Sequence, residues 1–338
     1  MNINLKEVFQ PKLFGLFKKG HYNKQTFMSD LIAGIIVGII ALPLAIAFGI
    51  ASGVTPQQGL ITAIVAGFLI SFFGGSNFLI GGPTGAFIVI VAGIVGQYGM
   101  QGLIIATIMA GVFLVAMGLA KMGAIFKYIP YPIVVGFTSG IALTIFTTQI
   151  KDLFGLSIEG SVPADFISKW AVYFENFSTI DLWTTVVGIL SIVIIAVTPK
   201  FSQKIPGSLI AIIVMTLVGL LLKNYGINVE TIGDRFKINP AIPEASMPDM
   251  DWQTIKNLIS PAITIAILGA IESLLSATVA DGVIGHKHNS NQELVGQGIA
   301  NILCPIFGGI PATGAIARTM TNINNGGKTP LAGVIHAI

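Results

Sequence analysis

Long apolar runs separated by short polar stretches dominate this chain. No charged residue occurs between Asp30 and Lys121. A helix that crosses a bilayer needs about 20 apolar residues, and several runs approach that length. We expect spans at about 31–53, 58–73, 84–98, 103–120, 130–150, 182–198, 208–223, 258–282, 292–306 and 312–322, with a further one beginning near Leu331. The segments 84–98 and 312–322 are too short to cross a bilayer comfortably.

The composition indicates an integral membrane protein. Hydrophobic residues make up 53% of the chain and charged residues 10%, against about a quarter charged in soluble proteins. The first apolar run is too long for a signal peptide. The single Cys304 excludes an intrachain disulfide and is expected to be a small buried residue. The net charge of +3 gives no indication of a nucleic-acid partner.

Residues 1–29 form a basic segment before the first span. Apolar residues lie between its five lysines, which are Lys6, Lys12, Lys18, Lys19 and Lys24. This pattern is typical of an amphipathic segment on a membrane surface, and we expect it on the cytoplasmic side. A disordered tail is the alternative.

Charges between the spans predict the orientation of the chain. With a cytoplasmic N-terminus, the loops expected inside carry Lys121, Lys127, Lys200, Lys204, Lys287 and Lys328. The long loops 151–181 and 224–257 then lie outside, and they are richer in acidic residues. Such an excess of lysine on the inner side is the positive-inside pattern. It predicts a multi-pass protein of the plasma membrane, here a bacterial inner membrane, and it requires both short segments to count as crossings.

Two short motifs match each other across the chain. Residues 83–86 read Pro-Thr-Gly-Ala and residues 312–315 read Ala-Thr-Gly-Ala, and each follows a Gly/Pro-rich break. Paired interrupted segments at corresponding positions of two halves indicate the binding site of a transporter.

The matching motifs also predict an internal repeat. A first unit, residues 30–225, would hold seven spans, so a second unit would start on the opposite side of the membrane and be inverted. The loop 226–257 would separate them outside the membrane. The second unit, residues 258–338, holds three expected spans and the start of a fourth. We therefore expect the sequence to be a fragment that lacks about four spans.

The two interrupted segments predict an anion site. Helix N-termini expose unpaired N–H groups and carry about half a positive charge, and they bind anions. The predicted site residues are Thr84, Gly85, Ala86, Thr313, Gly314 and Ala315. The alternative is that these glycines and prolines only bend the spans for packing.

Glu272 and Ser276 are candidates for coupling to a cation. An acid at the centre of a spanning helix costs about 2.5–3.5 kcal/mol on insertion scales, and such residues usually mark function. Ser276 follows four residues later, on the same helical face. The pair could hold Na⁺, or Glu272 could carry a proton; a structural pair with Arg318 is the alternative. From position alone, Arg318 either lends charge to the anion site or anchors to headgroups.

The remaining polar residues give no sign of catalysis. We expect Asp281 at the membrane interface. His286 and His288 resemble a metal pair but have no further ligand cluster, so we expect a solvated loop and no metal site. Phosphate-cradling and metalloprotease motifs are absent from the sequence, as is a Ser–His pair within the spans. The sequence therefore does not predict an enzyme.

Four stretches carry a specific family resemblance. They are Ala41–Gly53, Gly269–Gly282, His288–Gly298 and Phe307–Thr319, and they resemble the SulP family of sulfate permeases and related anion transporters. The first also resembles bacterial members that carry bicarbonate. The resemblance implies an all-α fold of seven plus seven inverted spans, shared with uracil permeases, with a core and a gate domain. It also implies a C-terminal STAS domain, which this sequence lacks.

The resemblance also implies roles for single residues. The anion would lie between the two short helices, Phe48 would line the pocket, and Arg318 would be the pocket arginine. Glu272 and Ser276 match residues that hold sodium in the bicarbonate carriers, so Na⁺ could bind at Glu272, Ser276 and Gly314. Because the acid here is Glu and not Asp, H⁺ and Na⁺ both stay open as the coupling ion.

The expected function is that of a secondary active transporter of inorganic anions, with sulfate or bicarbonate as substrate. Coupling to H⁺ or Na⁺ would drive the transport, and the core domain would move in an elevator-type mechanism. We expect no cofactor other than the coupling ion. The alternatives are a dicarboxylate transporter of the same family, an anion channel, and a nucleobase carrier on the same fold. The expected partners are the anion, the lipid bilayer and, in the full-length protein, a second copy in a homodimer, with no nucleic acid.

Overall fold

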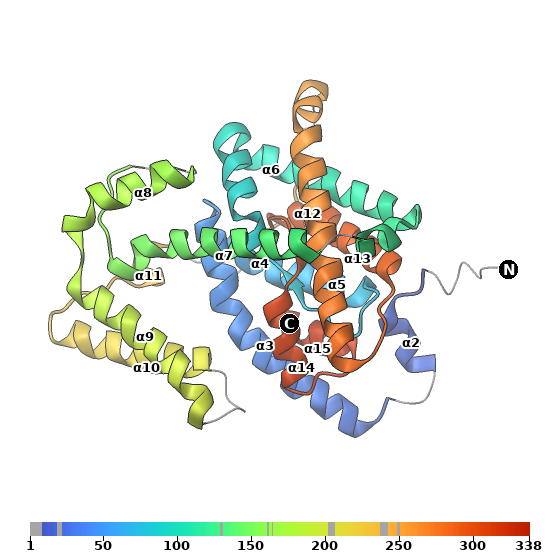
Figure 1. Cartoon of the computed structure of the whole chain (residues 1–338), viewed down its shortest axis with the longest axis horizontal. Coiled ribbons are helices and arrows are strands. Elements are labelled where there is room, and N and C mark those ends of the chain that lie inside the picture. The colour runs from blue at the N-terminus through green and yellow to red at the C-terminus, as the bar shows by residue number, and fades with distance from the viewer. Residues whose placement is uncertain are drawn as a thin grey trace. The chain divides into compact units, whose positions relative to one another are not determined.

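The structure is a computed structural model (Figure 1). It describes residues 9–18, 22–128, 131–160, 162–163, 165–201, 207–236, 243–248 and 251–338. The chain divides into two compact units. The first comprises Met1–Ile133 and Asn239–Ile338, and the second comprises Val134–Ile238. Both interrupted motifs belong to the first unit.

The first unit contains most of the helices. Its described elements are α2 (Lys12–Lys18), α3 (Lys24–Ala51), α4 (Pro56–Ile61), the π-helical turn η1 (Thr62–Ala66), α5 (Gly67–Phe73), β1 (Gly81–Gly82), the 3₁₀ turn η2 (Gly85–Phe87), α6 (Ile88–Leu119), η3 (Met122–Tyr128), α12 (Trp252–Ile284), α13 (Ser290–Leu303), η5 (Cys304–Phe307), β2 (Thr313–Gly314), α14 (Ile316–Asn324) and α15 (Pro330–Ala337). The elements of the second unit are most of α7 (Tyr131–Phe154), with α8 (Phe166–Glu175), η4 (Phe177–Thr179), α9 (Leu182–Phe201), α10 (Gly207–Asn224) and α11 (Ile232–Arg235).

Six helical stretches among the described residues are long and apolar enough to cross a membrane. They are Lys24–Ala51, Pro56–Phe73, Gly85–Leu119, Leu182–Phe201, Gly207–Asn224 and Trp252–Ile284. The expected segments 84–98 and 103–120 both fall within one helical stretch. It bends at Gly99, whose φ of 67° is one that glycine adopts readily. The predicted number of spans and the inverted repeat stay predictions.

The expectation of an all-helical chain needs correction at one place. β1 and β2 form an antiparallel pair in which Gly81 lies opposite Gly314 and Gly82 opposite Thr313. Residues 81–82 lie before the predicted short segment 84–98, whereas residues 313–314 fall at the start of the predicted segment 312–322, whose helix α14 begins only at Ile316. The strands therefore join the two breaks directly, although they are far apart in the chain.

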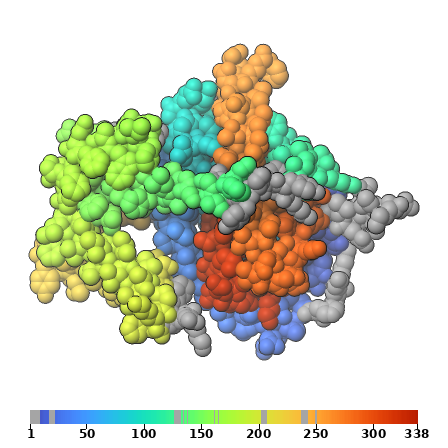
Figure 2. All heavy atoms as spheres, in the orientation of Figure 1, coloured from blue at the N-terminus to red at the C-terminus, as the bar shows by residue number. Residues whose placement is uncertain are grey.

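The core of the first unit lies between α6, α12 and α13. Leu103, Leu258, Ile265 and Leu294 are almost completely buried there. A methyl group on Gly111 would lie only 2.7 Å from the Gly298 carbonyl oxygen, so α6 and α13 pack at close range, as small residues allow in membrane helices. Figure 2 shows the start of α12, in light orange, projecting at the top of this view, although Leu258 in its second turn is buried in the core.

Asp30 joins the start of α3 to the start of α15. This fully buried carboxylate accepts bonds from the Lys328 amide at 2.7 Å and from the Thr329 amide at 3.1 Å. The Thr329 hydroxyl donates to it at 2.5 Å. Burial, with a further effect of the Asp30 charge, raises the pKa of the nearby Tyr22 to about 12.

The second unit exposes much apolar surface. Most of α9 and α10 is unburied, which suits contact with lipid. Ion pairs of this unit lie on its surface. Arg235 pairs there with Glu230 at 2.6 Å and with Asp152 at 3.0 Å. The Ser168 amide and hydroxyl hold the pKa of Asp165, the cap of α8, below its ordinary value. The helix α8 falls within the stretch that we expected to be a loop.

Candidate functional site

The strand pair brings the two Thr-Gly-Ala motifs together. Beyond the paired residues, the Ala315 amide donates to the Ile80 carbonyl at 2.8 Å. Thr84 directly precedes η2 and α6, and Ala315 directly precedes α14. Two helical segments therefore begin next to one another, and the first turn of each has N–H groups without intrahelical acceptors.

Helix α12 supplies two polar side chains to these helix starts. The Thr84 hydroxyl donates to Glu272 at 2.9 Å. The Ser273 hydroxyl lies 2.6 Å from the Thr313 hydroxyl and accepts from the Gly314 amide at 3.1 Å. Since Thr313 donates to the Gly269 carbonyl at 3.0 Å, Ser273 donates to Thr313. Glu272 thus contacts the first motif and Ser273 contacts the second.

Arg318 lies buried against the strand pair. The residue is 2% exposed, and its Nη2 donates to the Pro83 carbonyl. The other terminal nitrogen, Nη1, is buried and has no hydrogen-bond partner among the described residues. A methyl group on Gly82 would lie 2.5 Å from Nη1, so only glycine leaves room here. The structure therefore places Arg318 at the motifs and not at a solvated helix end.

Glu272 and Arg318 influence each other without direct contact. Their charges interact, but in the described part of the chain no ion pair joins them within 4.0 Å. Glu272 is instead hydrogen-bonded to Thr84. The alternative of a direct structural pair between Glu272 and Arg318 is thus not what the structure contains.

Ser276 takes a different place from the one expected for a sodium ligand beside Gly314. Its hydroxyl donates to the Thr319 hydroxyl at 3.2 Å, and that hydroxyl accepts from the Ile80 amide at 3.0 Å. The hydroxyl next to Gly314 belongs to Ser273. Ser273 directly follows Glu272 in sequence, which was the available signal, but helical spacing favoured Ser276.

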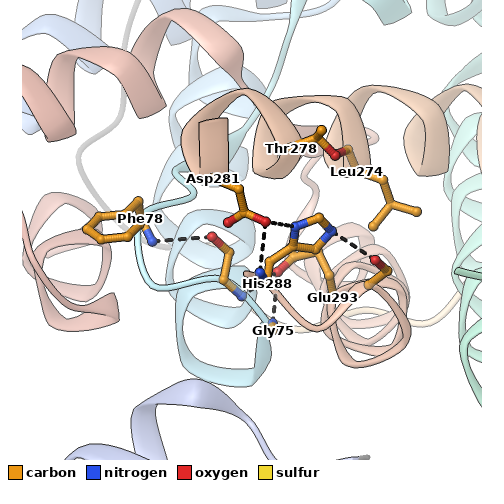
Figure 3. A network of polar contacts seen from close by, with 9 residues as sticks. Gly75, Phe78, Leu274, Thr278, Asp281, His288 and Glu293 are labelled. Carbon is orange, nitrogen blue, oxygen red and sulfur yellow. Dashed lines mark hydrogen bonds and ion pairs between the residues drawn. The ribbon is translucent and has the colours of Figure 1, made fainter. Parts of the chain in front are cut away.

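Helix α13 fixes the chain before each strand. The fully buried Glu293 accepts from the Gly75 amide at 2.8 Å (Figure 3). It also accepts from the Ser76 amide at 3.1 Å and from Gln297 at 2.9 Å. Asn301 exchanges two bonds with the Ala312 backbone, at 2.8 and 2.9 Å. Sequence reasoning missed both residues. For Glu293 a signal was available, because it is an acid within the expected span 292–306, whereas the type of Asn301 gave none.

A second polar group lies beside this one at the end of α12. The His288 ring contacts Asp281 at 2.7 Å and the Ser290 hydroxyl at 2.9 Å (Figure 3). The His288 side chain is only 6% exposed, whereas His286 and Lys287 are exposed. The expectation of a solvated loop is therefore wrong for His288, because Asp281 turns back to bind it.

The remaining predicted residues lie near or within the same helices. Gly85 is buried in η2, and Ala86 follows it. Phe48 is half-buried on α3, and its place in an anion pocket stays a prediction. Cys304 is fully buried, as expected.

The chain resembles known anion transporters over almost its whole length. The profile of the sulfate permease family matches residues 27–338. The chain belongs to the sulfate permease family. YvdB of Bacillus subtilis (strain 168), provisionally named a sulfate transporter, is 47% identical over 319 residues, which cover 94% of this chain and 59% of YvdB. The bicarbonate transporter BicA of Synechocystis is 33% identical, over 83% of this chain and 50% of its own length.

A solved structure agrees with this assignment. The transmembrane domain of a cyanobacterial bicarbonate transporter BicA superposes with a TM-score of 0.83 at 31% identity, covering 94% of this chain and 81% of that one. The chain therefore shares its fold with the membrane domain of a bicarbonate transporter of this family. It spans between half and three fifths of the length of the two curated relatives.

Proposed function

We propose that the complete gene product is a secondary active transporter of inorganic anions, with sulfate or bicarbonate as substrate. The observation that carries this proposal is the buried Nη1 of Arg318, which has no acceptor within the described part of the chain and lies at two adjoining helix starts. Unpaired buried donors are costly, and an oxyanion would satisfy them. Thr84, Gly85, Ala86, Thr313, Gly314 and Ala315 would surround the anion.

A coupling cation would bind at Glu272. The Glu272 charge acts on Arg318, and its contact with Thr84 links it to the first helix start. A proton or a Na⁺ ion at this position would change the charge of the site as the anion enters. A simple pore has no need of such a group, which favours a carrier over a channel.

The movement we propose is of the elevator type. Both motifs, Glu272 and Arg318 all belong to the first compact unit, so this unit could carry the whole site as one body. The protein would act in the plasma membrane, with its N-terminus in the cytoplasm and a second copy as partner in a homodimer.

The decisive test is uptake into proteoliposomes that contain the complete gene product. Labelled sulfate, bicarbonate and succinate would be supplied with and without Na⁺ and pH gradients. We expect saturable uptake of sulfate or bicarbonate that one of the gradients drives. Preference for succinate would indicate a dicarboxylate carrier, and unitary currents would indicate a channel.

The matched variants in this test are Glu272→Gln and Glu175→Gln. The first removes the ionisable group from the site, so we expect gradient-driven uptake to stop. The second changes an exposed carboxylate in the second unit and should leave uptake unchanged. Concentrative uptake retained by Glu272→Gln would contradict the coupling role.

A further inference from the structure

His336 is a buried base whose second nitrogen has no partner in the part of the chain that the structure describes. The side chain lies on α15, and the residue is 8% exposed. Its Nδ1 lies 2.9 Å from the Gly333 carbonyl. A carbonyl oxygen can only accept, so Nδ1 carries the hydrogen and the neutral ring keeps a lone pair on Nε2. That nitrogen is buried and without a hydrogen bond among the described residues.

The imidazole lies at the same strand as Arg318. A methyl group on Gly67 would lie 2.8 Å from His336 Cε1 and 3.3 Å from the Gly81 carbonyl oxygen. The next residue, Gly82, faces Arg318 Nη1. The ring and the guanidinium thus flank neighbouring residues of β1, and the charge of Arg318 reaches the ring.

The two unpartnered nitrogens are of opposite kinds. Arg318 Nη1 is a donor without an acceptor, and His336 Nε2 is an acceptor without a donor. A second positive charge beside Arg318 would be repelled strongly in this buried setting. An anion bound at Nη1 would offset that repulsion, so anion binding and protonation of His336 would favour each other.

Other charged groups lie away from His336. Helices α3 and α15 run in the same direction, because Asp30 contacts Thr329 whereas Gly38 approaches His336. Asp30 and Lys24 therefore lie toward or beyond the start of α15, away from His336.

Helix α5 runs the opposite way along α15 and carries no charged residue, and η1 carries none either. The α2 segment with Lys12 contacts Gly74, just beyond the end of α5 that is far from His336. Arg318 on α14 is the charged group that faces the ring among the described residues, and Glu272 on α12 acts in turn on Arg318.

We propose that His336 carries the proton when an anion and a proton move together through this site. On loading, Nε2 takes a proton from hydronium, which leaves water and an imidazolium held by the Gly333 carbonyl. On release the same proton returns to water on the other side of the membrane. This inference rests on the proposed transport function and assigns a coupled proton to His336, which leaves Na⁺ or a second proton to Glu272.

The test compares His336→Asn with the unchanged protein in proteoliposomes of the complete gene product. An Asn amide can still donate to the Gly333 carbonyl but cannot take up a proton. The matched control is Ser71→Ala, which removes another buried and unpartnered polar atom from the interface of α5 and α15. Two rates are measured: exchange of labelled sulfate or bicarbonate without a gradient, and anion-dependent proton entry reported by an internal pH dye.

We expect His336→Asn to retain exchange within about twofold and to lose at least about tenfold of the anion-dependent proton entry, which corresponds to about 1.4 kcal/mol of coupling or more. Ser71→Ala should keep both rates. If as many protons enter per transported anion in His336→Asn as in the unchanged protein, the inference is overturned. Anion transport by the unchanged protein without any proton movement would also overturn it, although the proposed anion transport would then stand.

A second measurement tests the inference if His336→Asn does not fold. Proton uptake on sulfate or bicarbonate addition is followed in purified protein for His336→Asn and His336→Gln, using whichever variant melts cooperatively. Loss of that uptake supports the inference, and its retention overturns it. If neither variant melts cooperatively, His336 is a packing residue and the inference fails. Absence of all anion binding and transport in the unchanged protein would instead refute the proposed function.

Discussion

Arg318 combines two properties that seldom occur together in a buried arginine. Its side chain is 2% exposed, yet one of its terminal nitrogens has no acceptor among the described residues. Burying an unpaired charge is expensive unless a partner arrives. The carbonyl of Pro83 accepts from Nη2 and thereby fixes the plane of the guanidinium. Nη1 is then held in place for an anion, which a flexible lysine ammonium would not achieve.

Substitution of Arg318 should weaken anion binding. A hydrogen bond to a charged group contributes about 1.5–3 kcal/mol, so Arg318→Ala should raise the half-saturating anion concentration about tenfold or more. Arg318→Lys should restore only part of this. The measurement is the concentration dependence of labelled-anion exchange in proteoliposomes.

The control for this prediction is Arg235→Ala. Arg235 also pairs with carboxylates, but it lies on the surface of the second unit, where ion pairs contribute about 0–1 kcal/mol. Its loss should leave exchange unaltered. An unchanged half-saturating concentration in Arg318→Ala would remove this arginine from the anion site.

At the scale of elements, glycine sets how closely the first helices approach. A methyl group on Gly59 of α4 would lie 2.0 Å from the Ala45 carbonyl oxygen of α3. That oxygen belongs to the backbone, so it cannot rotate away as a side chain could. The two helices must therefore separate if any side chain is added here, and α3 also packs against α14 and α15.

We predict that Gly59→Ala destabilises the protein whereas Gly93→Ala does not. Overpacking of this kind costs about 1–3 kcal/mol. Gly93 lies in α6 with no atom within 4 Å of an added methyl group, and alanine there should stabilise the helix by about 0.5–1 kcal/mol. Thermal unfolding in detergent would compare the two variants. Equal midpoints would show that α3 and α4 are not packed as described.

At the scale of the whole molecule, the sequence predicted a helix at each of the six candidate spans and the meeting of the two motifs. Apolar runs locate helices such as α9, α10 and α12 because lipid contact demands them. The strands escaped prediction because two residues each are too few to form a pattern. Helix α8 escaped because its charged residues resemble those of a loop. The contacts of Ser273 and Glu293 depend on which helix faces which, and no local spacing encodes that.

The predicted topology can be tested by labelling introduced cysteines, because the single native cysteine is buried. Cys304 is fully buried, so it should not react with a membrane-impermeant maleimide. Glu159 and Lys287 are both exposed, and the candidate spans α9, α10 and α12 lie between them. Three crossings place the ends of such a segment on opposite sides of the membrane. The lysine distribution further assigns Lys287 to the cytoplasm.

We therefore predict that Glu159→Cys reacts in intact cells, whereas Lys287→Cys reacts only after the membrane is permeabilised. The unsubstituted protein, unreactive in both conditions, is the background control. Labelling of both variants from outside would mean that one of the three helices does not cross. The reverse pattern would place the N-terminus outside and contradict the orientation. An odd number of crossings between the two motifs would invert the second motif relative to the first. Because α9, α10 and α12 lie between the motifs, this experiment also tests the inverted repeat that the paired helix starts require.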